Sequence, residues 1–249
     1  ERDPNLVEGV GSRVLGPILR RFLPPSEVPG RRARCAQAAA DLRSRAHPGS
    51  SAYLIATRLL AGWSDDLAWL GGIADGDTQI EPLADETDLR WIAIATLARR
   101  GSADATRIEA MRAIDDTVPG NLAALEALAM VPTTAAKEWA WDQIVGAHGR
   151  SNYELNALAT GFWRADDEDL VRPYVARYFT DIPALTGRLG EDALARVAAL
   201  AFPGVVEQPT ADLAQAALTR EDLGAAVRRE FVDGLARLEH ALASRRRFG

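Results

Sequence analysis

Apolar residues recur along most of the chain with a helical period, and the pattern is densest from Thr87 to Phe179. The clearest stripe places apolar residues at i, i+1, i+4, i+5, i+8 and i+9, namely Leu170, Val171, Tyr174, Val175, Tyr178 and Phe179. Pro173 lies inside this stripe and has no amide hydrogen to donate, so we expect a kink or a restart of the helix there. β-Branched residues are scattered singly, which predicts no strand.

Helix start and stop signals separate these apolar segments. The start signals are Ser64 to Asp66, Thr87 with Asp88, Thr133 with Thr134, the capping box Ser151-x-x-Glu154, Asp166 with Asp167, and Thr219-x-x-Asp222. The stop signals are the glycines Gly62, Gly76, Gly101, Gly146, Gly161 and Gly190. Several stops lie close to the next start, which predicts short connections between antiparallel neighbours and roughly a dozen helices of about eleven residues each.

Three further segments complete the pattern. Pro24 to Gly30 and Asp75 to Asp85 are rich in turn residues, so we expect loops there. The opening segment, from Leu6 to Leu23, predicts a helix that is too apolar for the terminal cap of a repeat array. It therefore suggests a missing neighbour on the N-terminal side.

The fold class predicted is all-α, an α-solenoid of antiparallel helical hairpins that form a HEAT- or armadillo-like superhelix. No repeat motif recurs in the letters themselves, so the periodicity is structural. At 249 residues such an array can form one unit, and we expect residues 1–249 to be a single helical domain. Because Glu1 stands where an initiating Met would be, we interpret the chain as a fragment of a longer one.

Composition excludes several classes of partner. The formal net charge of -6 argues against nucleic acid, since phosphates need a basic face. No apolar run approaches the roughly twenty residues that span a bilayer, so we expect no membrane partner. Cys35 is the only cysteine, which excludes an internal disulfide and fits a reducing compartment; we therefore predict a cytoplasmic location.

The familiar catalytic constellations are absent from the sequence. His47, His148 and His240 are far apart and none is followed by Glu, so there is no H-E-x-x-H zinc helix. No G-x-S-x-G nucleophile elbow occurs either. Acidic groups such as Asp115-Asp116 fall at helix ends, where solvated caps explain them. We assign no catalytic residue and no metal ligand to this chain.

Several segments nevertheless form a recognisable set of packing motifs. They are Thr87-Asp88-Leu89-Arg90-Trp91, Thr133-x-x-Ala136-Lys137-x-x-Ala140-Trp141, Gly161-Phe162-Trp163 and Pro173-Tyr174-Val175-x-Arg177-Tyr178-Phe179. These motifs resemble the C-terminal helical (ERAP1-like C-terminal) domain of actinobacterial aminopeptidase N, in the gluzincin (M1) family of zinc aminopeptidases. The resemblance is clear over 87–179, fair to the C-terminus and thin before Asp85.

The resemblance implies a role without catalysis in this chain. The family's H-E-x-x-H helix and its Gly-x-Met-Glu-Asn loop are both absent here, so zinc is expected only in a catalytic domain that lies outside this sequence. The family's helical domain forms a bowl that closes over that catalytic domain in cis and encloses the chamber in which peptide substrates bind. A bowl of this kind admits short peptides and excludes folded proteins.

Two alternatives remain open at this stage. One is a free-standing α-solenoid scaffold that binds a protein or peptide on its concave face. The other is an independent enzyme that uses the carboxylates, which the absent constellations disfavour. If the chain is the helical domain of a zinc aminopeptidase, which is the leading hypothesis, the candidates that face the chamber are Asn152, Trp163 and Arg164. They flank one predicted helix at its start and end.

Overall fold

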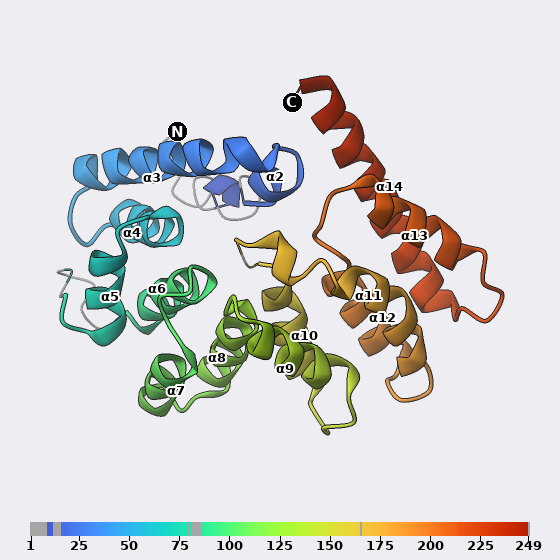
Figure 1. Cartoon of the computed structure of the whole chain (residues 1–249). Coiled ribbons are helices and arrows are strands. Elements are labelled where there is room, and N and C mark those ends of the chain that lie inside the picture. The colour runs from blue at the N-terminus through green and yellow to red at the C-terminus, as the bar shows by residue number, and fades with distance from the viewer. Residues whose placement is uncertain (1–8, 12–15, 79, 81–85, 165, 249) are drawn as a thin grey trace.

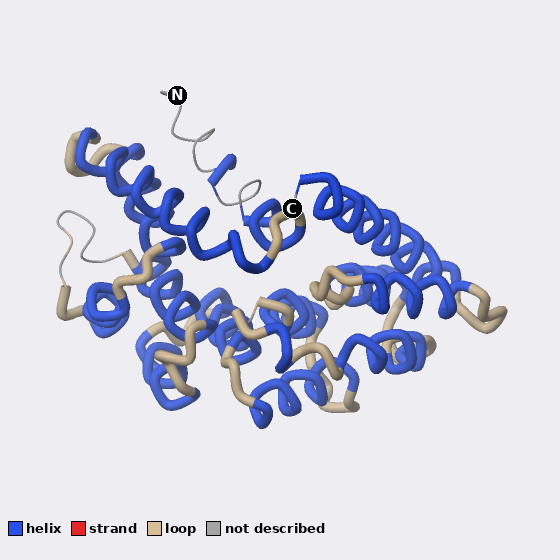
Figure 2. Tube along the Cα trace, turned by 45° about the horizontal axis from the view of Figure 1, so that its top comes forward, coloured by secondary structure: helices blue, strands red, loops and turns tan. Residues whose placement is uncertain are grey.

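The computed structural model describes residues 9–11, 16–78, 80, 86–164 and 166–248. Within these ranges the chain consists of helices joined by short connections, without a strand (Figure 2). The all-α prediction is therefore confirmed. The α-helices are α2 (Gly16–Arg21), α3 (Val28–Arg45), α4 (Ser51–Trp63), α5 (Leu67–Asp75), α6 (Thr87–Arg99), α7 (Ala105–Ile114), α8 (Val118–Met130), α9 (Thr134–Val145), α10 (Asn152–Phe162), α11 (Tyr174–Asp181), α12 (Glu191–Leu200), α13 (Gln208–Leu218) and α14 (Ala225–Phe248). Short 3-10 helices are η2 (Pro25–Glu27), η3 (Glu168–Leu170) and η4 (Pro183–Leu185).

The helices pack in the order of the sequence. Consecutive helices form the pairs α3 with α4, α5 with α6, α7 with α8, α9 with α10, and α13 with α14. The second members of these pairs, together with α12, also pack on one another, so that α4, α6, α8, α10, α12 and α14 form a continuous row. We call this the even-numbered row. The likeness to HEAT or armadillo repeats stays a prediction.

The chain curves into a ring whose two ends meet (Figure 1). The Arg245 guanidinium, on α14, donates hydrogen bonds to the carbonyl oxygens of Arg20 and Arg21 at the end of α2, each at 3.1 Å. The Phe22 ring packs edge-on against the His240 ring, with the centroids 5.9 Å apart. The last helix thus holds the first described helix in place.

Two apolar clusters form the core, one from α4 to α8 and one from α8 to α14. The second contains large buried aromatic residues, and the polar atoms of Trp141 and Tyr178 have partners. Trp141 Nε1 donates to the Asp181 carboxylate at 2.8 Å, and the Tyr178 hydroxyl donates to the carbonyl of Ala198 at 2.7 Å. Because a buried polar atom without a partner is costly, these bonds make the aromatic core specific as well as apolar.

Most predicted helix starts are confirmed. The side chains of Asp66 and Thr133 accept hydrogen bonds from backbone amides of the first turn, and Ser151 and Glu154 form the complete capping box. One start was wrong. Thr219 follows the end of α13, and the next helix begins only at Ala225, because the hydroxyl of Thr219 bonds backward to the carbonyl of Ala216.

Five of the six predicted stops lie within two residues of a helix end. Gly76 and Gly101 do follow helix ends, with the positive φ angles that glycine tolerates (83° and 73°). Gly146 also follows a helix end, that of α9, and Gly62 and Gly161 are the next-to-last residues of α4 and α10. Gly190 alone of the six was wrong, because it precedes α12. Packing explains the glycine at position 161, since a Cβ there would lie 2.2 Å from the carbonyl oxygen of Glu126 on α8. This glycine is what lets α8 and α10 approach closely.

The prolines act as expected in one place and not in another. The helix restarts at Pro173, so that Leu170 lies in η3 and α11 begins at Tyr174. The predicted loop from Pro24 to Gly30 is wrong in its second half, because α3 begins at Val28. Pro29 lies in the first turn of this helix, where a backbone amide has no helical partner, so its missing N–H removes no helical hydrogen bond. The predicted opening helix over Leu6 to Leu23 and the loop over Asp75 to Asp85 fall partly outside the described residues.

Candidate functional site

A cleft of about 590 Å³ is lined by residues of α2, α4, α6 and α8, together with Asp115 and Arg164. Helices α4, α6 and α8 each contribute residues three or four positions apart, which lie on one helical face. On α6 these are Asp88, Trp91, Ile92, Ala95, Thr96 and Arg99. Asp88 and Arg99 are 11 positions apart. At about 1.5 Å per residue the stripe on α6 is therefore about 16 Å long.

The helices that line the cleft run in the same direction. Arg99, the last residue of α6, donates to the carbonyl of Gly62 near the end of α4 at 2.9 Å. Lys137 links the carbonyls of Ala129 and Phe162, at the ends of α8 and α10. One end of the cleft therefore lies at the C-terminal ends of these helices, where cations are stabilised by the helix dipoles, and the other lies at their N-terminal ends.

Three arginines from three segments line the C-terminal end of the cleft: Arg20 on α2, Arg99 on α6, and Arg164 just after α10. We call this the cationic end. Glu126 on α8 accepts a hydrogen bond from Arg164 at 2.7 Å. Desolvation lowers the pKa of Arg99 to about 10, against the opposing effect of the carboxylate of Asp166. Desolvation, followed by the like charges of Arg164 and Arg99, lowers the pKa of Arg20 to about 10. Arg20 and Arg99 therefore remain charged at neutral pH.

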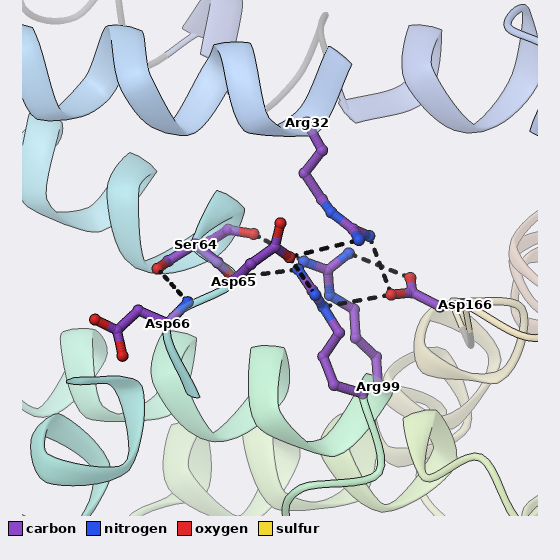
Figure 3. Close-up of polar contacts among 8 residues, drawn as sticks. Arg32, Ser64, Asp65, Asp66, Arg99 and Asp166 are labelled. Carbon is purple, nitrogen blue, oxygen red and sulfur yellow. Dashed lines mark hydrogen bonds and ion pairs between the residues drawn. The ribbon is translucent and has the colours of Figure 1, made fainter. Parts of the chain in front are cut away.

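Behind the cationic end lies a network of ion pairs (Figure 3). We call it the arginine–aspartate cluster; its members are Arg32, Asp65, Arg99, Arg100 and Asp166. Arg32 lies 3.0 Å from Asp166 and 3.5 Å from Asp65, and Arg100 lies 3.3 Å from Asp166 and also pairs with Asp65. The three arginine side chains are only 12% to 16% exposed. The cluster joins α3, the ends of α4 and α6, and the loop after α10.

The N-terminal end of the cleft is acidic. The Arg58 guanidinium, on α4, lies 3.1 Å from the carboxylate of Asp88. Asp115 accepts hydrogen bonds from the Thr117 hydroxyl and from Trp91 Nε1, both at 2.7 Å. These bonds, that from Thr117 most strongly, lower the pKa of Asp115. Asp115 is therefore ionised at neutral pH, and it holds the Trp91 indole in place against the cleft.

A buried lysine joins the C-terminal ends of α8 and α10, and sequence reasoning did not select it as a site residue. Lys137 on α9 is fully buried, its ammonium donates to the carbonyls of Ala129 and Phe162, and it lies 5.2 Å from the centre of the Phe162 ring. Desolvation lowers its pKa to about 7. The signal was available, since Lys137 is the only lysine of the chain while 28 residues are arginine. Where exposed cations are all arginine, a single lysine indicates a special environment.

The three predicted chamber residues lie in different places. Arg164 lines the cleft. Trp163 is half-buried, packs against the core and donates from Nε1 to the carbonyl of Ala201 at 2.7 Å. Asn152 is exposed at the far end of α10 and does not line the cleft. The structure thus brings Arg164 together with Arg20 and Arg99, which sequence reasoning did not select because they lie more than sixty positions away.

Neither a metal site nor a membrane span is found in the part of the chain that the structure describes. In that part no group of three or more His, Cys, Asp or Glu side chains could hold a metal ion. No helix there is both long and apolar enough to cross a membrane. The cleft is lined by guanidinium, carboxylate and indole groups, which recognise ligands by charge, hydrogen bonds and apolar contact.

The sequence profile of the ERAP1-like C-terminal domain family matches residues 13–240, most of the chain. The chain belongs to this family. It is also 32% identical over 207 residues to the aminopeptidase N of Streptomyces lividans. That match covers 82% of this chain and 24% of the relative, so the ERAP1-like domain spans about a quarter of the length of that protein. The resemblance drawn from the packing motifs is therefore confirmed.

Proposed function

We propose that this ERAP1-like domain is the C-terminal part of a zinc-dependent M1 aminopeptidase, and that it encloses the active-site chamber and helps to bind and size-select peptides. The family match and the aminopeptidase N relative support this proposal. The zinc and its ligands would belong to the catalytic domain, in the part of the protein that the match does not cover. The domain's own residues would bind and orient the substrate and exclude large molecules.

The observation that carries the proposal is the cleft. Its volume of about 590 Å³ lies within the range of about 300 to 1,000 Å³ that is typical of ligand sites. Its stripe on α6, about 16 Å long, corresponds to about five residues of extended peptide at about 3.3 Å each. Apolar residues such as Trp63, Ile92 and Met130 alternate with charged residues in its lining, as the binding of a mixed peptide requires.

Contacts remote from the reacting bond can still raise the rate of catalysis. Binding energy from the far part of a peptide can be used to orient the scissile bond, which lowers the barrier of the chemical step. The even-numbered row and the closing contact between α2 and α14 form a rigid wall for such contacts. A short peptide fits beside this wall, whereas a folded protein is too wide.

The first experiment is the intact mass of the native polypeptide, captured with an antibody raised against this chain, with sequencing of whatever precedes Glu1. We expect a polypeptide several-fold larger that carries H-E-x-x-H. A species of the mass of this chain alone would refute the proposal and favour the free-standing scaffold. The cytoplasmic location, which rests on the single Cys35, is tested in the same extract by fractionation.

The second experiment tests the chamber residues in the full-length enzyme. Substituting Arg164 should raise KM for longer peptides more than for single aminoacyl substrates, because only longer peptides reach the cleft. Trp163, which precedes Arg164 but packs against the core, is substituted in parallel and should show the same preference if it holds Arg164 in the chamber. Asn152, exposed at the other end of α10, is substituted in parallel as the third predicted residue. Arg112→Gln is the control, since Arg112 is exposed, pairs with Glu109 and lies outside the cleft. Equal effects on long and short substrates would contradict a role in the chamber.

A further inference from the structure

Lys137 lies between two helix ends that border the cleft. Its side chain donates hydrogen bonds to the carbonyl of Ala129 on α8 and, at 2.8 Å, to the carbonyl of Phe162, the last residue of α10. Both carbonyls belong to last turns, where the helix itself offers no donor. Because Lys137 is fully buried, water does not compete for these bonds. The lysine therefore ties the C-terminal ends of α8 and α10 together.

The position of Lys137 on its own helix does not explain the charge. Lys137 is the fourth residue of α9, and a cation near a helix N-terminus is opposed by the helix dipole. The same cation is favoured at the C-terminal ends of α8 and α10. An ammonium group has three hydrogens and a neutral amine has two, so both carbonyls keep a donor in either protonation state. The side chain thus serves the two neighbouring helices rather than α9.

The two helix ends carry side chains that line the cleft. On α8 these are Met130, directly after the first acceptor, and Glu126, one turn earlier. On the other side Arg164 lines the cleft two residues after Phe162, and its backbone amide donates to the carbonyl of Gly161 at 3.1 Å. The Arg164 guanidinium donates to the Glu126 carboxylate at 2.7 Å. The geometry of this pair therefore depends on how far apart the two helix ends lie.

The separation of α8 and α10 is limited from both sides. Gly161 allows the close approach, since a Cβ there would lie 2.2 Å from the carbonyl oxygen of Glu126. Lys137 opposes separation at the last turns, which are the parts of helices that fray most easily. A movement of about 1 Å would stretch the 2.7 Å bond between Glu126 and Arg164 beyond hydrogen-bonding distance. Small shifts at the buried lysine would therefore change the wall of the cleft.

We propose that Lys137 is a positioning residue for substrate binding, which holds the Glu126–Arg164 pair where the pair contacts a peptide in the cleft. The inference rests on the proposed function, because it requires a peptide in the cleft. Lys137 is fully buried and does not touch the peptide itself. It acts through the ends of α8 and α10. A lysine that only stabilised the fold would not favour one class of substrate over another.

The test measures kcat and KM of the full-length enzyme with a hexapeptide and with an aminoacyl p-nitroanilide. Only the hexapeptide is long enough to reach the cleft, whereas the anilide reports on the catalytic site. Lys137→Met removes both hydrogen bonds and nearly keeps the length of the side chain. We expect KM for the hexapeptide to rise at least about fivefold, with both constants for the anilide within about twofold of the native values, because only a remote contact is lost.

Two further variants separate positioning from stability. Ser151→Ala is the matched control, since it removes the capping box at the opposite end of α10 and destabilises the helix without touching the bridge. It should leave KM for the hexapeptide unchanged. Lys137→Gln keeps a donor for one carbonyl and should give a smaller rise than Lys137→Met. It also replaces the methionine variant if circular dichroism melting curves show that the latter does not fold.

A double-mutant cycle identifies the path of the effect. Its reference is an enzyme without the pair, made by Glu126→Gln together with Arg164→Gln, which leaves neither charge without its partner. If Lys137 acts through this pair, adding Lys137→Met to that enzyme should raise KM for the hexapeptide by less than about twofold, because coupled residues are not additive. A further rise as large as in the native background would show that Lys137 acts elsewhere, and the inference would be wrong.

The remaining outcomes separate the inference from the proposed function. Equal rises for both substrates, or the same rise in Ser151→Ala, would mean that Lys137 only stabilises the fold. If removal of the pair raises KM for the hexapeptide but neither Lys137 variant does, the inference is wrong and the proposed function stands. If removal of the pair changes KM for neither substrate, this wall binds no peptide. The inference and the peptide-binding part of the proposed function are then both refuted.

Discussion

Replacing Lys137 by methionine tests the account of the buried lysine most directly. Methionine has nearly the same length and shape as the lysine side chain but carries neither charge nor donor. The substitution removes the hydrogen bonds to the carbonyls of Ala129 and Phe162, which costs about 1 to 3 kcal/mol for each carbonyl left without a partner. It also removes a buried group whose pKa is lowered to about 7.

The size of the effect follows from the two pKa values. The pKa of Lys137 falls from 10.5 to about 7 on folding, and each unit corresponds to about 1.4 kcal/mol, so the penalty for the charged form is on the order of 5 kcal/mol. Between these values the unfolded chain binds the extra proton. The free energy of unfolding therefore rises with pH above about 7, by about 1.4 kcal/mol per unit, until it levels off near 10.5.

The assay compares the native chain with Lys137→Met between about pH 7.5 and pH 9.5. Over two units the native chain should gain about 3 kcal/mol relative to the variant, which corresponds to roughly 5 to 10 °C in the difference between their Tm values. Other groups titrate equally in both proteins and cancel in the difference. Lys137→Arg is the matched control, since a guanidinium stays charged throughout and should show no such gain.

A direct readout is available because the chain contains one lysine. Lysine labelled with ¹³C at Cε gives a single nuclear magnetic resonance signal, and its chemical shift should titrate near pH 7 in the folded protein. A midpoint near 10.5 would refute the argument, because it would mean that the two carbonyls and the helix ends fully offset desolvation. Parallel Tm profiles for the native chain and Lys137→Met would refute it independently.

Three further predictions follow from local geometry. Gly161→Ala should force α8 and α10 apart and lower the free energy of unfolding by about 1 to 3 kcal/mol in a urea titration. Gly30→Ala on α3 is the control and should be neutral or stabilising, because a Cβ there meets nothing within 4 Å. Similar effects at both positions would contradict the packing argument. Ser151→Ala removes the capping box of α10 and should cost about 1 kcal/mol in the same titration, with a loss below measurement error counting against the capping role. Arg245→Gln removes the hydrogen bonds from α14 to the end of α2, so amide exchange measured by mass spectrometry should become faster over 16–21 and stay unchanged over 118–130.

Helix existence and helix starts were predictable because their signals are local. An apolar period of three or four residues, a capping box and a proline act within one or two turns, and these signals identified α10 and the restart before α11. Glycine was ambiguous for the same reason. Gly76 follows the end of α5 with a positive φ angle, whereas Gly161 is the next-to-last residue of α10, and only the approach of α8 shows that packing requires a glycine there.

The sequence by itself determined the helical class, most of the helix starts and, through packing motifs, the family. Only the tertiary structure decided where the cleft lies. The cleft gathers residues from Gly16 to Arg164, and of its cationic end only Arg164 was predicted. The physical reason is that the curvature of a helical array accumulates from small rotations at each interface, which depend on side-chain packing between distant segments. The burial of Lys137 and the meeting of α2 with α14 depend on that same curvature, and no local signal encodes it.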